Sequence, residues 1–544
     1  MDFFHNKQKK FYKGDFLMKR LLALALSLVM ILGVLLMAGC NNDPVDGSSN
    51  SSSSSSSASE NAGSTSSSDN DGSTSSSDND GSTSSSDKGD DDEFNESKKM
   101  PGYENIDFGG RTFVIIGADG ESDGFNTAKE IYLDPKNENP DAIDLAVDKR
   151  NKLIEAHYNC IIQGEVVDSP ATDANNNVLK GGKPIDIFNQ KYASITLGSG
   201  GKAYNLYELG SKSIDFTADY FDQAYVKQLS VKDNNGNNKL YGIVGDFARS
   251  SFDCTHAIVF NKTVYANTEA IRDIDVYQLV RDGKWTLDTF MTMVKAAAVD
   301  NKDPGTYDAV EDGDIVGWIR TQHAPHGLHV ASGLEIMSNV DGKYVFNIQT
   351  NLSAWSAVID KACAAWAAPE GQTTSYTNIP DAVAGGRALF ASEILSSSLG
   401  NLKDLDVEIG LLPYPTYNEG DPYYHYVDEH FSPYAVPLHV EDIDNVGDFL
   451  VLFAYYSKYI VRPAYISLYA YEYCSDEDSY DMLNTILNSR TYDVGYLGPK
   501  YEGEITTMIS NNKASQISGF ANGKAKIVGT WINEYFSKIT ANKS

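Results

Sequence analysis

The chain is poor in basic residues and in cysteine. Its 544 residues contain 44 Lys and Arg against 75 Asp and Glu, which gives a formal net charge of −31. A nucleic-acid partner needs a basic surface that displaces counterions from phosphates, so this balance argues against one. The 5 cysteines are too few for a disulfide scaffold and lack the paired spacing of a structural zinc site. We expect no essential disulfide among Cys160, Cys254, Cys363 and Cys474.

Motifs of catalysis and of nucleotide binding are also missing. The sequence has no GxSxG, no HExxH and no GxxxxGK[ST]. His323, His326 and His329 recur every third residue, a spacing that would suit a metal site on a helix. Pro325 and Gly327 should break such a helix, so ordinary pocket or surface histidines are favoured. We expect no metal site and no cofactor.

One long apolar run stands near the start of the chain. Residues 21–37 are almost wholly apolar, and Lys19 and Arg20 precede them. The run is compatible with a short membrane anchor or with an export signal. It ends in Leu-Met-Ala-Gly-Cys, which resembles the bacterial lipoprotein signal, whose cysteine is diacylated and becomes the mature N-terminus. We therefore predict a signal peptide at 1–39 and lipidation of Cys40.

Low-complexity sequence follows this signal. Residues 40–99 consist mainly of Ser, Asp, Gly and Asn, and the sequence GSTSSSD begins at Gly63, Gly72 and Gly81. Such a segment cannot bury enough apolar surface to offset the entropy of ordering it. We predict a disordered tether between the lipidated cysteine and a folded domain at 100–544.

The remainder alternates between strand and helix patterns. Short apolar runs at 111–116, 184–188 and 257–260 predict buried strands. Residues 140–158 follow a helical period, with Asp141 as a plausible N-cap. Strands that alternate with helices favour an α/β fold with ligands at the carboxyl ends of parallel strands.

Several segments resemble one family. Residues 283–290 (GKWTLDTF) are similar to a helix start of family 1 extracellular solute-binding proteins, the receptor subunits of ABC sugar importers. Four further segments agree with that family in order, and they read FNK at 260–262, AGGRALF at 384–390, GLLPYP at 410–415, and YDML with RTYDVG at 480–495. The last is similar to a clostridial branch. The resemblance spans about residues 103–544.

The resemblance implies a two-lobed periplasmic-binding-protein-like fold with hinge crossovers. Lobe 1 would comprise about 103–252 and 415–468, and lobe 2 about 253–414 and 469–544. A solute would be held in the cleft between them and passed to ABC permease subunits, with no chemistry on the ligand. The protein is then expected to be a monomer, anchored by lipid to the outer face of a Gram-positive type cell membrane.

Candidate ligand contacts follow from the family's loops, matched residue by residue. The resemblance places Trp318 on a cleft loop, where it should report lobe closure. The matched set is Asp119, Glu121, Asn189, Gln190, Tyr192, Asp253, Trp318, Arg320, Gln322, His323, Glu393, Tyr424 and Glu429.

The identity of the ligand stays open at this stage. Planar polar groups and aromatic faces suit an oligosaccharide. Ile394 and Leu395, however, stand where sugar binders of the family often carry an aromatic residue, so a peptide or another polar solute is an alternative. A sensor lipoprotein without a permease and a surface enzyme such as a glycoside hydrolase are the other classes considered. Paired carboxylates cannot discriminate the enzyme, because 75 acidic residues guarantee such pairs by chance.

Overall fold

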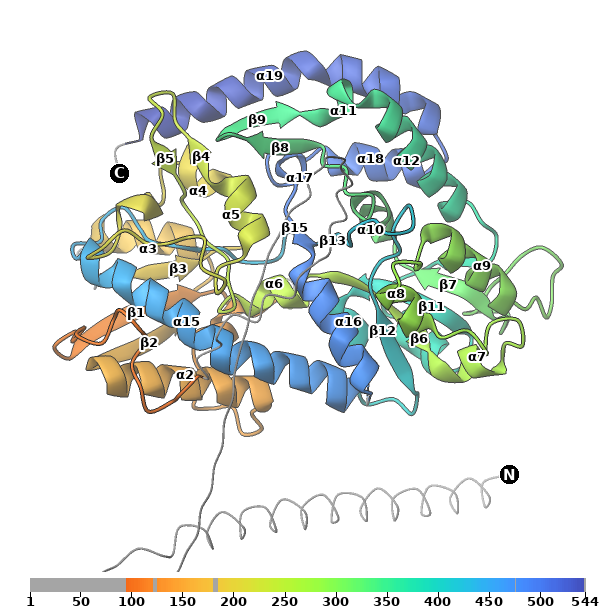
Figure 1. Ribbon diagram of the computed structural model, residues 1–544, viewed down its shortest axis with the longest axis horizontal. Helices are drawn as coiled ribbons and strands as arrows, with labels where there is room; N and C mark the ends of the chain where they lie inside the picture. The colour runs from red at the N-terminus through yellow and green to blue at the C-terminus, as the bar shows by residue number, and fades with distance from the viewer. Residues whose placement is uncertain (1–93, 121–124, 180–183, 475, 543–544) are drawn as a thin grey trace, which may run out of the picture. The chain divides into compact units, whose positions relative to one another are not determined.

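Two separate β-sheets organise the folded part of the chain in the computed structural model (Figure 1). The structure describes residues 94–120, 125–179, 184–474 and 476–542. The predicted signal peptide, Cys40 and nearly all of the predicted tether lie outside these residues. None of the described helices is long and apolar enough to cross a membrane.

The first sheet has four strands in the order β14-β3-β1-β2. Its central strand, β1, runs parallel to both β2 and β3, whereas β14 pairs with β3 in the antiparallel sense. The bounds are β1 Arg111–Gly117, β2 Cys160–Val166, β3 Ile187–Asn189 and β14 Tyr434–Ala435. The predicted strand at 111–116 is confirmed, and the one at 184–188 begins later than expected.

Long helices cover this sheet. They are α2 (Ala142–Tyr158) and α15 (Ile443–Ser467), which continues as the π-helical segment η3 (Leu468–Tyr473). Asp141 is the N-cap of α2 as predicted, and the structure shows in addition that it forms a capping box. The ring of Phe113 on β1 stacks on Phe449 of α15 at 4.2 Å, and both side chains are fully buried. Shorter elements on this side are η1 Thr127–Glu130, α3 Pro170–Leu179, α4 Thr196–Ser199, η2 Leu206–Glu208, α5 Gln223–Leu229, β4 Val231–Lys232 and β5 Asn238–Lys239.

The second sheet has five strands in the order β10-β7-β11-β6-β12. Strands β10, β7 and β11 are parallel, and β6 is antiparallel to both β11 and β12. The bounds are β6 His256–Asn261, β7 Val316–Arg320, β10 Gly371–Thr373, β11 Ala388–Ile394 and β12 Ile409–Leu412. The predicted strand at 257–260 is confirmed as the centre of β6. The mixed α/β class is therefore confirmed.

Residues that carried the family resemblance build the core beside this sheet. Thr286 caps α9 (Leu287–Ala297) by accepting from the N–H of Thr289, and Trp285 is fully buried with its Nε1 donating to the carbonyl of Pro413 at 2.8 Å. The neighbouring helices are α7 Lys262–Asn267, α8 Val276–Arg281, α13 Ile379–Ala384, α14 Leu395–Gly400 and α16 Glu477–Asn488.

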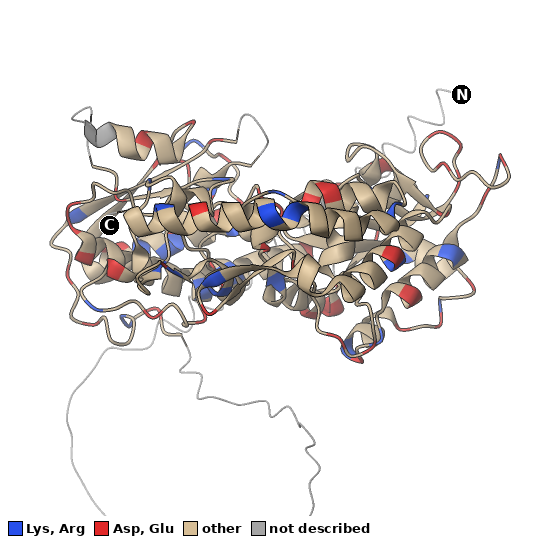
Figure 2. Ribbon diagram, turned by 90° about the horizontal axis from the view of Figure 1, so that it is seen from above, with Lys and Arg blue, Asp and Glu red and all other residues tan. Residues whose placement is uncertain are grey.

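A third group of elements, with α19 along its top, extends from one sheet to the other (Figure 1). It comprises α10 Ala324–Val330, β8 Met337–Val340, β9 Lys343–Phe346, α11 Asn347–Thr350, α12 Leu352–Trp366, β13 His425–Tyr426, β15 Arg490–Thr491, α17 Val494–Leu497, α18 Glu502–Ser510, η4 Ala514–Gln516 and α19 Ile517–Ala541. Figure 2 views the molecule from the α19 side and shows acidic and basic positions interspersed.

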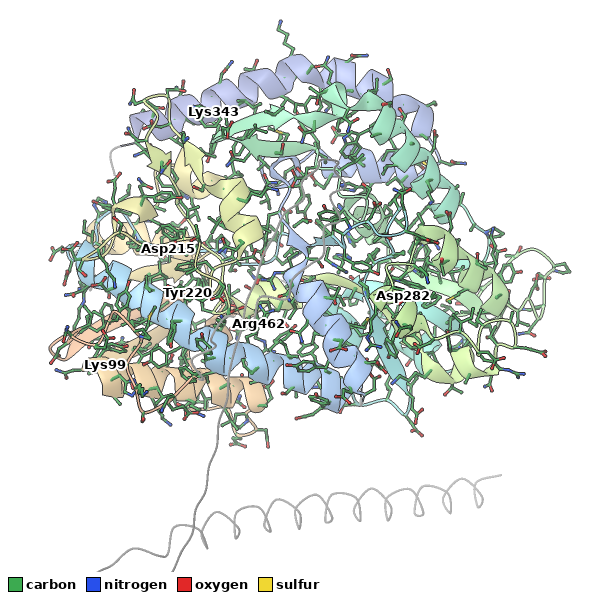
Figure 3. The ribbon with its side chains drawn as sticks, in the orientation of Figure 1. Lys99, Asp215, Tyr220, Asp282, Lys343 and Arg462 are labelled. Atoms are coloured by element: carbon green, nitrogen blue, oxygen red, sulfur yellow. The ribbon has the colours of Figure 1, made fainter. Side chains whose placement is uncertain are left out.

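Helix α19 contacts both sides of the molecule. Thr540 accepts from the N–H of Asn234 at 2.9 Å, and Asn542 donates to the carbonyl of Gly198, so its end lies against the first sheet's shorter elements. Toward its start it packs on α12, whose last residue, Trp366, contacts the ring of Trp318 on β7. A second contact between this third group of elements and the first-sheet side comes from Lys343 of β9 (Figure 3). Its Nζ donates a hydrogen bond to the carbonyl of Lys232 at 2.8 Å.

Helix α10 contradicts the prediction that its Pro and Gly would prevent a helix. Pro325 lies in the first turn, where a missing N–H costs nothing because that group has no partner within a helix. Gly327 is needed for close packing, since a Cβ there would lie 2.3 Å from the ring of Tyr414.

The folded part begins earlier than the sequence suggested. Phe94, assigned to the tether, stacks on Tyr459 of α15 with ring centroids 4.8 Å apart. Glu96 accepts from Lys149 of α2 at 2.5 Å. An isolated aromatic residue at the end of a polar tract is a weak sequence signal, because its packing partner is more than 350 positions away.

Candidate functional site

A cleft with a volume of ≈1120 Å³ lies between the two sheets, at the carboxyl ends of their parallel strands. From the first sheet, the segment after β1 contributes Phe125 to Glu130. From the second, Thr321 follows β7, Thr374 follows β10, and Ile394 ends β11. This is the position at which α/β folds commonly bind ligands, because loops and unpaired strand ends meet there.

Two segments that connect the sheets form the floor of the cleft. The short helix α6 (Arg249–Asp253) carries the chain to β6, and the stretch from Asp428 to His430 leads back toward β14. The N–H of Asp428 donates to the carbonyl of Cys254 at 2.9 Å, so the two connections are joined to each other.

Arg249 and Asp253 on α6 neutralise each other within the floor. The Arg249 Nε donates to Asp253 Oδ2 at 3.2 Å, and the hydroxyls of Tyr465 and Tyr469 both donate to Asp253 Oδ1 at 3.0 Å. Burial, the largest influence, opposes ionisation of Arg249, but the charge of Asp253 and those of the other acidic groups nearby together outweigh it and raise the pKa of the guanidinium. The carboxylate of Asp253 is thus fully engaged within the protein.

Glu130 is a buried acid on the first-sheet wall. Its side chain accepts from the N–H of Ser250 at 2.8 Å and from the amide Nδ2 of Asn189 at 2.9 Å. Burial raises its pKa to about 8 despite the hydrogen bonds from Ser250. Glu130 therefore joins the η1 segment of the first sheet to the connecting helix α6.

His256 is a buried histidine that lines the cleft without a partner. It begins β6 and is 1% exposed, and its Nδ1 has no hydrogen-bond partner among the described residues. Its ring lies 4.9 Å from that of Tyr426. Burial lowers the pKa of His256 to about 4, so the imidazole is neutral at physiological pH.

An aromatic cluster forms the wall beside the return connection. The ring of His430 stacks on Phe125 at 4.7 Å and meets Tyr192 edge-on at 4.9 Å. His430 Nδ1 is hydrogen-bonded to Asp428 Oδ1. Burial alone would raise the pKa of Asp428, but the hydrogen bond and charge of His430 lower it below its usual range.

The second-sheet wall carries hydroxyl groups and one exposed ring. Thr373, Thr374 and Ser375 precede Tyr376, which is 61% exposed and lines the cleft. Glu393, near the end of β11, is 9% exposed, and burial raises the pKa of its carboxyl group. Flat rings on opposite walls and many hydroxyls suit the recognition of a polar solute with C–H faces.

Four of the matched residues line this cleft. They are Asp253, Gln322, His323 and Glu393. Asn189 lies one layer behind, since its amide donates to Glu130 and its Oδ1 accepts from Thr127, and both of those residues line the cleft. Tyr192 reaches it indirectly, through the ring of His430.

The prediction that Trp318 lies on a cleft loop is wrong. It is the central residue of β7, is fully buried, and donates from Nε1 to Ser392 Oγ at 2.9 Å. Arg320 ends the same strand and is 2% exposed, with its guanidinium 4.3 Å from the ring of Trp318 and 4.2 Å from that of Trp366. Neither belongs to the cleft lining, which begins on this segment at Thr321, the first residue after the strand.

The remaining matched residues lie elsewhere. The Gln190 side chain accepts from the N–H of Ala171 at 2.9 Å, and Glu429 pairs with Lys500 at 2.7 Å. Tyr424 packs beside the cluster of Val330, Tyr426 and Tyr496. Asp119 does not line the cleft, and Glu121 is outside the described residues.

Sequence reasoning missed the cleft residues Phe125, Glu130, Arg249, His256 and Tyr376. His256 was missed because the strand it begins was expected to be parallel to its neighbours. The first residue of such a strand lies at the amino edge of the sheet, opposite the carboxyl edge where ligands bind. In the structure β6 is antiparallel to β11, which brings its first residue to the carboxyl edge of its neighbour. Phe125, Glu130, Arg249 and Tyr376 lie in segments before or after strands, and no sequence motif marks these segments as part of a site.

The three spaced histidines do not form a metal site. His326 and His329 are buried in α10, and His326 stacks on Tyr426 at 4.9 Å. Within the described residues, no group of three or more His, Cys, Asp and Glu side chains could hold a metal ion.

No protein-family model and no curated protein matches the sequence significantly. Among solved structures, a family 1 extracellular solute-binding protein from Bifidobacterium longum subsp. infantis is similar at a TM-score of 0.47 and 15% identity, over 76% of this chain and 99% of that one. The galacto-N-biose-/lacto-N-biose I-binding protein of the ABC transporter from Bifidobacterium longum is similar at a TM-score of 0.47 and 13% identity, over 78% of this chain and 98% of that one. UspC from M. tuberculosis is similar at a TM-score of 0.47 and 14% identity, over 76% of this chain and 99% of that one.

Proposed function

We propose that the protein is an extracellular solute receptor that binds an oligosaccharide in the cleft and delivers it intact to an ABC importer. The observation that carries this proposal is the cleft itself, which is lined from two sheets and floored by the segments that connect them. A solute that contacts both walls favours the state in which they are close, because only that state provides both sets of contacts. The ordered sequence resemblance over about residues 103–544 supports the same function.

The oligosaccharide is favoured over a peptide by the composition of the walls. Phe125 and Tyr376 offer flat apolar faces, and Thr373, Thr374 and Ser375 offer hydroxyls that both donate and accept. In this proposal, the rings of Phe125 and Tyr376 take the place of the aromatic residue that sugar binders of the family often carry at 394–395.

Anchoring and delivery complete the proposal. Cys40 would carry the lipid, residues 41–93 would form most of the tether, and the receptor would act as a monomer at the outer face of the cell membrane beside its permease. Two acyl chains on one cysteine make such an anchor stable, whereas one chain binds membranes only marginally.

Isothermal titration calorimetry with the purified protein tests the binding step. The panel contains maltotetraose, raffinose, lacto-N-biose, cellotetraose and a set of tripeptides. We expect saturable binding of an oligosaccharide and its recovery intact by chromatography after prolonged incubation. Binding of tripeptides alone would make the protein a peptide receptor, and the appearance of shorter sugars would make it a hydrolase.

A further inference from the structure

Arg320 carries a buried charge that no carboxylate of the described residues neutralises. Its Nη2 donates to the carbonyl of Trp366 at 2.6 Å, while Nε and Nη1 have no hydrogen-bond partner among those residues. The Oε2 of Glu370, which precedes β10, is likewise buried without a partner, so these atoms do not pair with one another. Burial lowers the pKa of Arg320 to about 9, and the group is therefore mainly charged at neutral pH. Burying such a charge is costly, and its surroundings must offset that cost.

Two indole rings and one helix end stabilise this charge. The guanidinium carbon lies 4.3 Å from the ring centre of Trp318 and 4.2 Å from that of Trp366, and the face of an indole ring attracts a cation. Trp366 is the last residue of α12, and the C-terminal end of a helix carries a partial negative charge. Gly371 of β10 leaves room for the group, since a Cβ there would lie 1.8 Å from Nη1. Trp318→Phe would keep an aromatic face against the guanidinium.

Two segments of the second-sheet wall that line the cleft leave the sheet at Arg320. Thr321 follows Arg320 directly, and residues 321–323 all line the cleft. On the neighbouring strand β10, Thr373 is the register partner of Arg320, and the N–H of Thr374 donates to the Arg320 carbonyl at 2.9 Å. Residues 373–376 also line the cleft. The backbone of Arg320 thus joins the two lining segments to each other, and its side chain joins them to α12.

We propose that Arg320 is a positioning residue of the receptor, whose charge, held between Trp318 and Trp366 at the end of α12, fixes segments 321–323 and 373–376 in the arrangement that the ligand meets. It does not touch the ligand and acts through the backbone of the two segments. An apolar side chain of similar length would fill the space between the rings without binding the carbonyl of Trp366, so the end of β7 would be free to shift against α12. The effect on binding rests on the proposed function, whereas the effect on the two segments does not.

Hydrogen exchange of the ligand-free protein, followed by mass spectrometry, tests the positioning. In Arg320→Met, the peptides that contain 321–323 and 373–376 should exchange at least tenfold faster, because the amide of Thr374 then loses a fixed acceptor. Thermal unfolding should change little, since replacing a buried charged group by an apolar residue is often neutral for stability.

Two further variants complete this test. Gly371→Ala keeps the charge of Arg320 but displaces Nη1 with the added Cβ, and it should speed up exchange in the same two peptides. Arg387→Met is the matched control, because Arg387 precedes β11 of the same sheet, donates to the backbone carbonyl of Ala309 and does not line the cleft. It should leave both peptides unchanged. Wild-type exchange in both Arg320→Met and Gly371→Ala, or equal acceleration in Arg387→Met, would overturn the proposal.

Arg320→Lys tests whether the charge itself is required. Burial disfavours the charged form of a lysine, so the amine loses its proton at a lower pH than the guanidinium of the wild type. Once exchange is corrected for its intrinsic dependence on pH, the Lys variant should resemble the wild type at about pH 6 and approach the Met variant as the pH rises. Tyr414, a second titratable group near the guanidinium, stays neutral over this range because burial raises its pKa. A Lys variant that matches the Met variant at every pH would contradict a role for the charge.

Calorimetry then connects the position of the wall to binding. For the solute of the panel that the wild type binds most tightly, Arg320→Met should weaken binding at least tenfold, and Arg387→Met should leave it within twofold. Unchanged affinity in Arg320→Met would overturn the role in binding, even if exchange is faster. If the wild type binds no solute, the proposed function fails, and the exchange experiment alone decides whether Arg320 positions the two segments.

Discussion

The guanidinium of Arg249 and the carboxylate of Asp253 are joined across one turn of α6, with Nε and Oδ2 3.2 Å apart. The side chains are 18% and 17% exposed, so the pair lies in the floor of the cleft and not at its rim. Because α6 connects the two sheets, the pair links successive turns of the segment about which they would rotate relative to each other.

Asp253→Ala should lower the free energy of unfolding by about 2 to 4 kcal/mol, since it leaves Arg249, Tyr465 and Tyr469 without their shared acceptor. Urea denaturation measures the loss. Asp282→Ala is the matched control, because Asp282 lies on the surface (Figure 3) and its carboxylate is bound only by the side chains of Gln278 and the exposed Lys284 among the described residues. It should change stability by less than about 0.5 kcal/mol. Similar losses in the two variants would show that the Asp253 pair contributes no more than a surface ion pair.

Tyr376→Ala should weaken sugar binding by about 1 to 2 kcal/mol without changing stability, because this exposed ring lines the second-sheet wall. Titration calorimetry and thermal unfolding separate the two effects. Tyr471→Ala serves as the comparison, as Tyr471 is 49% exposed and lies outside the cleft lining. An unchanged affinity in the Tyr376 variant would remove this ring from the binding surface.

The strongest local patterns predicted the fold better than they predicted the site. The strand predicted from the short apolar run at 111–116 and the N-cap predicted at Asp141 are confirmed because short-range chemistry determines them. The direction of β6 depends on its pairing with β11, more than 100 residues away, and no local pattern encodes it. The position of His256 in the cleft follows from that direction, so it could not be derived locally.

Trp318 is a second residue whose position local sequence patterns could not predict. The run from Val316 to Arg320 reads equally well as a loop next to a strand or as the strand itself, and its pairing with β10 and β11 decides the matter. Asp253, Gln322, His323 and Glu393 line the cleft as the match to the family's loops implied, although no local pattern in the sequence placed the elements around them.

Stability should depend on pH through Glu130. Its carboxyl has a pKa of about 8 in the folded protein, against 4.5 as the ordinary value, so between these pH values the folded state holds more protons than the unfolded state. The free energy of unfolding should therefore fall as pH rises from 5 to 8, with a contribution from this group of up to about 1.4 kcal/mol per pH unit. Urea unfolding of the wild type and of Glu130→Gln across this range isolates the effect, because the Gln variant cannot ionise. Parallel pH profiles for the two proteins would contradict the buried acid.

Trp318→Phe should cost about 1 to 3 kcal/mol of stability and leave ligand affinity unchanged, since the indole packs in the core and donates to Ser392 Oγ. Any change of tryptophan emission on ligand binding should persist in this variant, because none of the five tryptophans lines the cleft. Loss of affinity with intact folding would place Trp318 at the site after all.

Cys40→Ser should release the protein into the culture medium, because the variant cannot be acylated and the rest of the chain would be soluble once the signal is cleaved. Immunoblots of membrane and medium fractions provide the measurement. A variant that stays in the membrane fraction would identify residues 21–37 as an uncleaved anchor.

The C-terminal helix α19 gives the two sheets a second mechanical link. Its end is bonded to Gly198 and Asn234 on the first-sheet side, while α12 connects its start to β7 on the other. A rotation of the two sheets that widened the cleft would pull on both ends of α19. The helix would then have to move with one sheet, bend, or lose the hydrogen bonds at its C-terminal end. Any opening of the cleft would therefore be limited at a point remote from the ligand, and the energy it needs would depend partly on contacts that the ligand never touches.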